Sequence, residues 1–454
     1  MSGDLTLTVS SDCLLQEADP ALLAALKKEL TVANPAYRDA RKYGRWIGKK
    51  LKPWLYFYSE TSNGFRFPRG FASRALGLCR KYQAAPRLID LRRSLPEIDF
   101  SFQGKLRPYQ QEALRDTVRR EFGVIESGTG SGKTVLGLAI IAHRHQPTLV
   151  LVHTKELLHQ WAARIEAFLG LEPGLVGDGR FELRPVTVAI VNSARNRLSE
   201  LPEHFGQIVV DECHRVPSTL FTEVVTAFDC RFALGLSATA FRRDGLTELI
   251  HFHLGECTHR VNQDRLHQSG AVLKPEFIQQ ETDFSYGYRG NYQNLLKALT
   301  GNRERNRQIC ADIVREAEGE GAGTILVVSD RIAHCQTLAN ELQRMQPDLS
   351  LAVLTGRMPS EERNELIEKI RGGEIRVLIS TVQLIGEGFD CPGLRTLFLT
   401  TPIKFSGRLL QVVGRILRPA ADKNPRVYDY LDPVGVLKAS ARIRRLLFED
   451  GTPG

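Results

Sequence analysis

The sequence lacks the features that mark secreted, membrane-bound and zinc-binding proteins. Its eight cysteines are dispersed over 454 residues and none forms a C-x-x-C pair, which indicates a reduced intracellular chain without a zinc knuckle. The N-terminus has neither a basic segment nor an apolar one, and no apolar run approaches the length that spans a bilayer. We therefore expect no signal peptide, no transmembrane segment and no membrane partner, and a cytoplasmic, nucleoid-associated location.

The excess of basic over acidic residues is small overall and is concentrated in one stretch. The formal net charge is +9, yet residues 37–82 alone hold twelve basic and two acidic residues, so the rest of the chain is nearly neutral. Cations interleaved with aromatic rings are typical of surfaces that neutralise phosphates and stack bases. The alternative is a small domain whose rings form its core and whose cations are only solvated. The nucleic-acid contacts expected here are Trp46, Trp54, Lys49, Lys50 and Lys52.

The pattern of apolar residues divides the chain into three parts. Residues 1–100 read as a small basic α+β domain, with strands at 5–9 and 54–58 and a helix at 20–30. Residues 101–262 and 263–454 alternate short apolar strands with helices, which is typical of parallel sheets covered on both faces. We interpret residues 255–275 as a linker and expect a C-terminal helix. The expected strands are 124–125, 148–152, 186–191, 208–210 and 232–236, then 325–328, 351–354, 377–379, 396–399 and 427–430.

The stretch SGTGSGKT, residues 127–134, has the composition and setting of a phosphate-binding loop. It follows an apolar strand and precedes a helical pattern, and its glycines can adopt positive φ so that backbone N–H groups converge on a polyphosphate. Lys133 is expected to reach the β- and γ-phosphates of ATP, and Thr134 to hold Mg²⁺. Ser127 stands where the pattern usually has glycine, and a loop that only caps a helix is the alternative. The expected ATP contacts are Gly128, Thr129, Gly130, Ser131, Gly132, Lys133 and Thr134.

Two carboxylates follow the apolar strand expected at 208–210. A carboxylate at the tip of a strand beside a phosphate-binding loop lies where Mg²⁺ needs a ligand, directly or through water, and the next carboxylate can orient the attacking water. We therefore expect Asp211 to bind the metal and Glu212 to activate water.

With Cys213 and His214 the two carboxylates read DECH, and at this point the sequence resembles the superfamily 2 helicases and translocases of the DEAD/DEAH-like group. The resemblance runs from residue 106 to about residue 431. It implies two tandem RecA-like parallel-sheet domains behind the small N-terminal domain, with ATP hydrolysis at their interface driving movement on nucleic acid.

Two motifs of the first half carry contacts that the resemblance implies. LRPYQ, residues 106–110, resembles the adenine-reading motif and implies that Arg107 and Gln110 contact the nucleotide. LVLVHTKELLHQW, residues 149–161, resembles motif Ia and implies that Thr154 and Lys155 contact the nucleic-acid backbone.

Further motifs extend the resemblance to both halves. LGLSAT, residues 234–239, resembles motif III, which implies that Ser237 and Thr239 couple hydrolysis to movement. VLISTVQLIGEGFDCP, residues 377–392, resembles motif V, which implies a backbone-phosphate contact by Thr381 and a ribose or interdomain contact by Asp390.

QVVGRILRP, residues 411–419, resembles motif VI. Gln411, Arg415 and Arg418 would share one face of a helix, because they are spaced at i, i+4 and i+7. The resemblance implies that the two arginines act as fingers on the γ-phosphate.

The DECH box, Gln411 and the Gln-Trp pair after motif Ia are similar to the XPB-like, UvsW-like and restriction-motor branch. That branch implies an ATP-dependent helicase or translocase on duplex, forked or branched DNA, in repair, recombination or replication. Three alternatives stay open: the motor subunit of a restriction or phage-defence system, an RNA helicase, and a nucleic-acid-binding protein with a relic ATPase fold.

One cluster outside these motifs suggests a metal site. His251 and His253 would share a face of a strand, with Cys257 and His259 close behind. The spacing matches no familiar zinc pattern, so a polar linker is the favoured interpretation.

Overall fold

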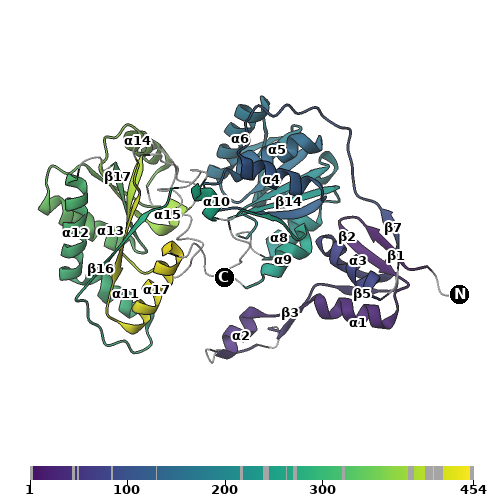
Figure 1. The fold of residues 1–454 in the computed structure, drawn as a ribbon, viewed down its shortest axis with the longest axis horizontal. Coiled ribbons are helices and arrows are strands. Elements are labelled where there is room, and N and C mark those ends of the chain that lie inside the picture. Colours follow the sequence, from purple (N-terminus) through teal and green to yellow (C-terminus); the bar gives the residue numbers. More distant parts are fainter. Residues whose placement is uncertain are drawn as a thin grey trace. The chain divides into compact units, whose positions relative to one another are not determined.

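The computed structural model describes residues 4–42, 46–48, 51–82, 85–128, 130–214, 218–238, 245–261, 263–268, 273–319, 323–356, 358–386, 393–403, 413 and 423–449. The chain forms two compact units (Figure 1). The first contains residues 1–127 and 132–261, and the second contains residues 128–131 and 262–454. Each is a layered α/β structure, as the apolar pattern predicts.

A small α+β layer opens the first unit. Its five-stranded sheet has the order β5-β6-β2-β1-β7. β2 and β6 bury every second residue, which is the pattern of a sheet with one covered face. The bounds are β1 Thr6–Val9, β2 Asp12–Gln16, α1 Pro20–Glu29, β5 Ser59–Thr61, β6 Gly64–Pro68, η1 Arg69–Phe71, α3 Ala72–Lys81 and β7 Arg87–Asp90. The strand expected at 5–9 and the helix expected at 20–30 are thus confirmed.

A two-stranded ribbon of β3 Thr31–Ala33 and β4 Trp54–Tyr56 carries α2 Pro35–Lys42 beside this layer (Figure 1). The strand expected at 54–58 ends at Tyr56. The reason is that Phe57 and Tyr58 leave the ribbon for the apolar core, where Phe57 meets Phe252 and Tyr58 stacks on Phe65. In contrast, Trp46, Trp54 and Tyr56 are 89%, 49% and 60% exposed. The aromatic residues of the basic stretch therefore divide between core and surface.

An eight-stranded sheet in the order β11-β10-β12-β9-β13-β14-β8-β15 dominates the first unit. All of its pairs are parallel except β10 with β11. The bounds are β8 Phe122–Glu126, β9 Thr148–Val152, β10 Gly174–Gly177, β11 Arg180–Glu182, β12 Val186–Ile190, β13 Gln207–Asp211, β14 Phe232–Ser237 and β15 Cys257–Arg260. All five strands predicted for this part are confirmed. β15 corrects the interpretation of residues 255–275 as a linker; its polar sequence, CTHR, gave no apolar signal for an edge strand.

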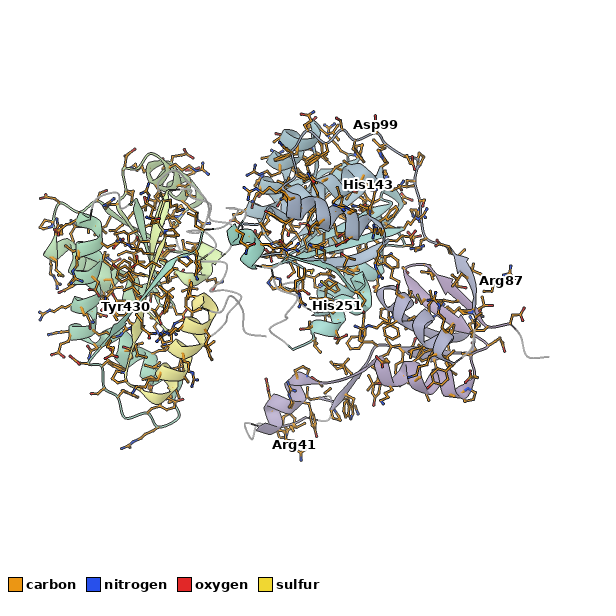
Figure 2. The ribbon with its side chains drawn as sticks, viewed as in Figure 1. Arg41, Arg87, Asp99, His143, His251 and Tyr430 are labelled. Atoms are coloured by element: carbon orange, nitrogen blue, oxygen red, sulfur yellow. The ribbon has the colours of Figure 1, made fainter. Side chains whose placement is uncertain are left out.

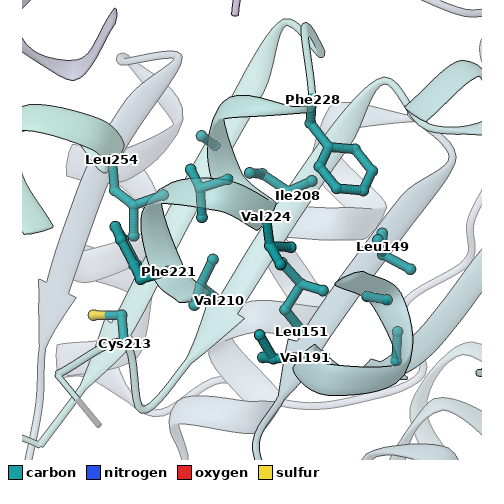
Figure 3. Packing of buried hydrophobic residues seen from close by; sticks show 14 of the residues in the cluster. Leu149, Leu151, Val191, Ile208, Val210, Cys213, Phe221, Val224, Phe228 and Leu254 are labelled. Atoms are coloured by element: carbon teal, nitrogen blue, oxygen red, sulfur yellow. The ribbon is translucent and has the colours of Figure 1, made fainter. Parts of the chain in front are cut away.

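Helices cover both faces of this sheet. One core forms against α4, α5 and α6, and the other forms against α7, α8 and α9, as the close view in Figure 3 shows for Phe221, Val224 and Leu254. The bounds are α4 Pro108–Val118, α5 Lys133–Arg144, α6 Lys155–Leu169, α7 Val191–Arg195, η2 Pro202–His204, α8 Ser218–Thr226 and α9 Thr247–Leu254. Two covered faces explain why the central strands are apolar throughout.

The second unit is built on a six-stranded, wholly parallel sheet in the order β16-β21-β20-β17-β19-β18. The five strands predicted for this half are confirmed, and β16 is an additional edge strand. The strand bounds are β16 Glu276–Glu281, β17 Thr324–Ser329, β18 Leu351–Leu354, β19 Val377–Thr381, β20 Leu394–Leu399 and β21 Arg426–Leu431. The helix bounds are α10 Gln263–Gln268, α11 Tyr292–Gly301, α12 Arg303–Glu318, α13 Ile332–Met345, α14 Ser360–Arg371, α15 Val382–Gly386 and α17 Gly435–Glu449. Within the described ranges, no helix is long and apolar enough to cross a membrane.

The N-terminal layer is fixed to the large sheet of the first unit by a buried arginine. The guanidinium of Arg69 donates to the carbonyl oxygens of Phe228 (2.8 Å) and Cys230 (2.9 Å). Gly70 lies so close to α9 that a Cβ there would be 2.5 Å from the backbone nitrogen of Gly255. Arg74 adds ion pairs with Glu248 at the start of α9 and with Glu256 just after its end. Separating the two layers would leave the buried guanidinium of Arg69 without these acceptors, which is costly. The contacts therefore hold the two layers together.

His253 lies at this junction, and its position corrects the proposed histidine cluster. His251 and His253 belong to α9 rather than to a strand, so they do not share a face; Figure 2 labels His251. Among the residues that the structure describes, no group of three metal-binding side chains could hold an ion. Burial, and then the charge of Arg69, lowers the pKa of His253 to about 3.

Acid should therefore destabilise the first unit partly through His253. Its folded pKa lies below the unfolded value, so its contribution is complete above about pH 6.5 and is lost as pH falls toward 3. Between pH 7.5 and 5.5 we expect wild type to lose about 1 kcal/mol more stability than His253→Leu. Urea unfolding at both pH values measures the difference. His143→Leu, at an exposed position of α5, should behave as wild type, and equal losses in all three proteins would contradict the assignment.

Candidate functional site

The phosphate-binding loop connects β8 to α5. Gly130 (φ 88°) and Gly132 (φ 79°) adopt the left-handed conformation that the sequence predicts for a loop wrapped around phosphates. A Cβ at Gly132 would lie 2.6 Å from the side-chain nitrogen of Gln110, so a larger residue would not fit. Gly132 is also the N-cap of α5 and brings no capping side chain, so an anion can satisfy the N–H groups at the helix start.

Lys133, the first residue of α5, lies between the loop and the carboxylates at the end of β13. Its ammonium nitrogen is 3.2 Å from the carbonyl oxygen of Ser127 and 3.5 Å from a carboxylate oxygen of Glu212. The two charged side chains are 11% and 15% exposed. A cation poised this way can transfer to an incoming phosphate, which would leave Glu212 available to a water molecule.

Glu212 is held in an uncommon backbone conformation. Its φ is 47°, a left-handed value that is uncommon for a residue with a side chain. The conformation is stabilised locally, because the backbone N–H of Glu212 donates to a carboxylate oxygen of Asp211 at 2.9 Å. The turn directs the two consecutive carboxylates into different surroundings.

Asp211 ends β13 and is almost completely buried. One carboxylate oxygen accepts the hydrogen bond from Glu212, and the other accepts one from the indole N–H of Trp161 at 2.8 Å. Burial, and then the charge of Glu212, raises the pKa of Asp211, whereas Lys133 opposes that rise. Where burial disfavours the charged form of a carboxylate, a bound divalent cation stabilises that form strongly. The carboxylate of Asp211 and the hydroxyl of Thr134 at the start of α5 are hard oxygen donors that fit Mg²⁺.

His214 and Ser237 join this group from the turn after β13 and the end of β14. The Nδ1 atom of His214 is 2.8 Å from the hydroxyl oxygen of Ser237 and 3.4 Å from a carboxylate oxygen of Glu212. Motif III is thereby connected to the carboxylates through one histidine. Sequence reasoning gave His214 no role of its own, although its place in the DECH box was a signal.

Gln110 and Arg107 lie at the start of α4, close to the loop. The side-chain oxygen of Gln110 accepts from the backbone N–H of Arg107 (2.9 Å), and its nitrogen donates to the carbonyl oxygen of Gly132 at 3.4 Å. The amide of Gln110 is therefore held against the phosphate-binding loop. That place agrees with a nucleotide contact.

The residues predicted to touch nucleic acid through motif Ia lie at the start of α6. Thr154 is the N-cap and accepts from the backbone N–H of Leu157 at 3.3 Å. The ammonium of Lys155 pairs with Asp178, which also contacts His159. The side chain of Lys155 remains 65% exposed although it is paired with Asp178. A phosphate would compete with Asp178 for this cation.

The other predicted residues divide between described and undescribed parts of the chain. In the second unit, Thr381 ends β19 directly before α15. In the first unit, Lys52, Trp46 and Trp54 are exposed. The predictions that lie outside the described residues are Thr129, Thr239, Asp390, Gln411, Arg415, Arg418, Lys49 and Lys50.

Comparison with known proteins agrees with this geometry. Residues 103–242 match the family described as "Type III restriction enzyme, res subunit", and residues 306–420 match the "Helicase conserved C-terminal domain". The chain is a superfamily 2 helicase or translocase. The members of this superfamily are ATP-driven enzymes with two RecA-like domains, and the two parallel sheets are these domains.

Individual relatives carry helicase names. The chain is 26% identical to "DNA 3'-5' translocase XPB2" of Sulfurisphaera tokodaii over 352 residues, 69% of this chain and 79% of the relative. It is 27% identical to "Probable helicase D10" of Escherichia phage T5 over 328 residues, 70% of each chain. The Hef helicase domain of Pyrococcus furiosus has a similar fold, with a TM-score of 0.51 and 16% identity over 75% of this chain and 98% of that one.

Two substitutions in the nucleotide site should stop hydrolysis at different stages. Lys133→Ala removes the cation expected to face the phosphates, and Glu212→Gln removes the group expected to orient water, so each should lower kcat at least about a hundredfold. Glu212→Gln should still bind ATP, whereas Lys133→Ala should bind it weakly. Steady-state ATPase rates and nucleotide titrations separate the two effects. Lys28→Ala, at an exposed position of α1, serves as control, and near-normal turnover in either site variant would refute the assignment.

Proposed function

We propose that this chain is an ATP- and Mg²⁺-dependent DNA helicase or translocase that acts on duplex, forked or branched DNA in repair, recombination or replication. The observation that carries the proposal is the buried group of Lys133, Glu212 and Asp211 beside a glycine-rich loop in the phosphate-binding conformation. The names of several relatives, among them "Putative DNA 3'-5' helicase Rad25" of Halobacterium salinarum, support DNA as the substrate.

In this proposal each group around the phosphate-binding loop has one task. The loop N–H groups and Lys133 bind the phosphates, Thr134 and Asp211 hold Mg²⁺, and Glu212 orients the attacking water. Bound Mg²⁺ would neutralise charge on the β- and γ-phosphates. Gln110 and Arg107 would contact the base of the nucleotide. Ser237, through His214, would couple the state of the nucleotide to the residues that bind nucleic acid.

The second unit would complete the site. We assign Gln411, Arg415 and Arg418 to the γ-phosphate, and Thr381 and Asp390 to the nucleic-acid backbone and ribose or interdomain contacts. The parts of the chain would then be residues 1–100 for DNA engagement, 101–262 for nucleotide binding, and 263–454 for the fingers.

Arg418→Ala tests the role of the second unit. Losing a finger removes charge stabilisation that is needed only in the transition state, so kcat should fall at least about a hundredfold while ATP affinity changes little. Single-turnover hydrolysis with a separate binding titration measures both quantities. Arg442→Ala, on the C-terminal helix α17, is the control. Normal turnover in Arg418→Ala would contradict the proposal that the second unit contributes to the active site.

The substrate is tested by ATPase stimulation. Single-stranded DNA, duplex DNA, forks, four-way junctions and RNA are each titrated into the intact chain. The proposal expects duplex or branched DNA to stimulate most. Preferential stimulation by RNA would favour an RNA helicase; a relative named "Putative ATP-dependent RNA helicase L396" exists in mimivirus. The motor subunit of a restriction system stays the second candidate, because residues 103–242 match such a family.

The exposed ribbon of the N-terminal part is the proposed extra DNA contact. Around β3, β4 and α2 it exposes Trp46, Trp54 and Lys52, together with Arg38 and Arg41; Figure 2 labels Arg41. Arginines and a lysine can neutralise phosphates, and the indoles can stack on bases. The ribbon belongs to the same compact unit as the nucleotide-binding loop's helix, so it would travel with that helix.

Lys52→Glu and Trp54→Ala should weaken DNA binding in different ways. Removing a phosphate contact releases fewer counterions, so Lys52→Glu should lower affinity and flatten its dependence on salt, whereas Trp54→Ala should lower affinity with an unchanged slope. Titrations at several salt concentrations measure both, and basal ATPase should not change. Lys297→Glu in α11 is the matched control. Unchanged affinity and slope in well-folded variants would mean that the ribbon is an ordinary solvated surface without a role in DNA binding.

A further inference from the structure

Trp161 is a fully buried side chain that makes one polar contact of functional interest. It has no exposed surface, and its indole N–H donates to a carboxylate oxygen of Asp211 at 2.8 Å. The other oxygen of that carboxylate accepts from the backbone N–H of Glu212 at 2.9 Å. Two donors on opposite oxygens fix the plane of the carboxylate. An indole can only donate, so this contact favours the charged, metal-binding form of Asp211.

The ring of Trp161 also lies against the helix of the phosphate-binding loop. A Cβ at Gly137 in α5 would lie 3.0 Å from the outer edge of the indole and 3.2 Å from Leu236, so glycine makes room for the ring. One side chain of α6 therefore contacts the end of β13 and the second turn of α5. These two elements carry Asp211 and Lys133 respectively.

The helix that carries Trp161 begins at the proposed nucleic-acid contacts. Thr154 caps α6 and Lys155 is its first residue. Trp161 follows six residues later, about 9 Å along the helix axis at the usual rise per residue. If nucleic acid displaced the start of α6, the rigid helix would also move Trp161 and its hydrogen bond to Asp211.

We propose that Trp161 is a positioning residue for the Mg²⁺ ligand Asp211, and that it connects nucleic-acid contact at the start of α6 to the metal site. The inference rests on the proposed function, in which Asp211 holds Mg²⁺. Groups that orient a metal ligand typically change metal affinity or activity by about ten- to a hundredfold when they are removed. Trp161 is thus assigned a role beyond filling the core.

Trp161→Phe tests the hydrogen bond, because it keeps an aromatic ring and removes the donor. The dissociation constant of a slowly hydrolysed ATP analogue is measured with Mg²⁺ and with EDTA. We expect the affinity with Mg²⁺ to fall about tenfold and the affinity in EDTA to stay the same. Ile165→Val, which trims another fully buried side chain of α6 without removing a polar atom, controls for loss of packing and should bind as wild type in both buffers.

A spectroscopic measurement decides the matter even if Trp161→Phe does not fold. In Trp46→Phe/Trp54→Phe, Trp161 is the remaining indole of the chain. Its emission should change when Mg²⁺ is added to the protein saturated with nucleotide, and change again when duplex DNA is added. Unchanged emission with Mg²⁺, or wild-type Mg²⁺ dependence in a folded Trp161→Phe, would overturn the positioning role. No response at DNA concentrations that a binding titration shows to saturate the double variant would overturn the connection. If wild type binds no nucleotide at all, the proposed function itself fails.

Discussion

The nucleotide site of the first unit depends on keeping one lysine and two carboxylates together, with little exposure to solvent, at one edge of a parallel sheet. The sheet order makes this possible, because β13, β14 and β8 are neighbours and their carboxyl ends meet at one edge. The loop before Lys133 follows β8, the pair Asp211 and Glu212 lies at the end of β13, and Ser237 ends β14. Charges so poorly hydrated stabilise one another only while they are paired, so the group is poised to exchange partners when a phosphate and a divalent cation arrive.

A second constraint is the attachment of the N-terminal layer. Arg69 donates from that layer to the carbonyl oxygens of Phe228 and Cys230, and Arg74 pairs with carboxylates at both ends of α9. The basic, aromatic ribbon belongs to the same compact unit as this layer and Lys133. A DNA contact on the ribbon would thus be carried by the body that binds the phosphates, instead of by a flexible appendage.

The sequence predicted what depends on local chemistry. Apolar runs predicted ten strands, nine of them central and one, β18, at a sheet edge. The glycines of residues 127–134 predicted the left-handed conformation of the loop. Polar edge strands such as β15 were missed because neither face is apolar, and His251 and His253 were placed on a strand although they lie in a helix. Trp161 was read only as part of a motif, since its contact with Asp211 joins residues fifty positions apart and no local pattern encodes it. The fingers and the ribbon lysines remain predictions.

The central claim is that the chain has one nucleotide site, built around Lys133. Isothermal titration of the intact protein with a slowly hydrolysed ATP analogue and Mg²⁺ tests this claim most directly. The account predicts one nucleotide bound per chain, although the chain contains two similar α/β units, with an affinity that falls when Mg²⁺ is removed. Two equivalent sites per chain, or no binding, would contradict it.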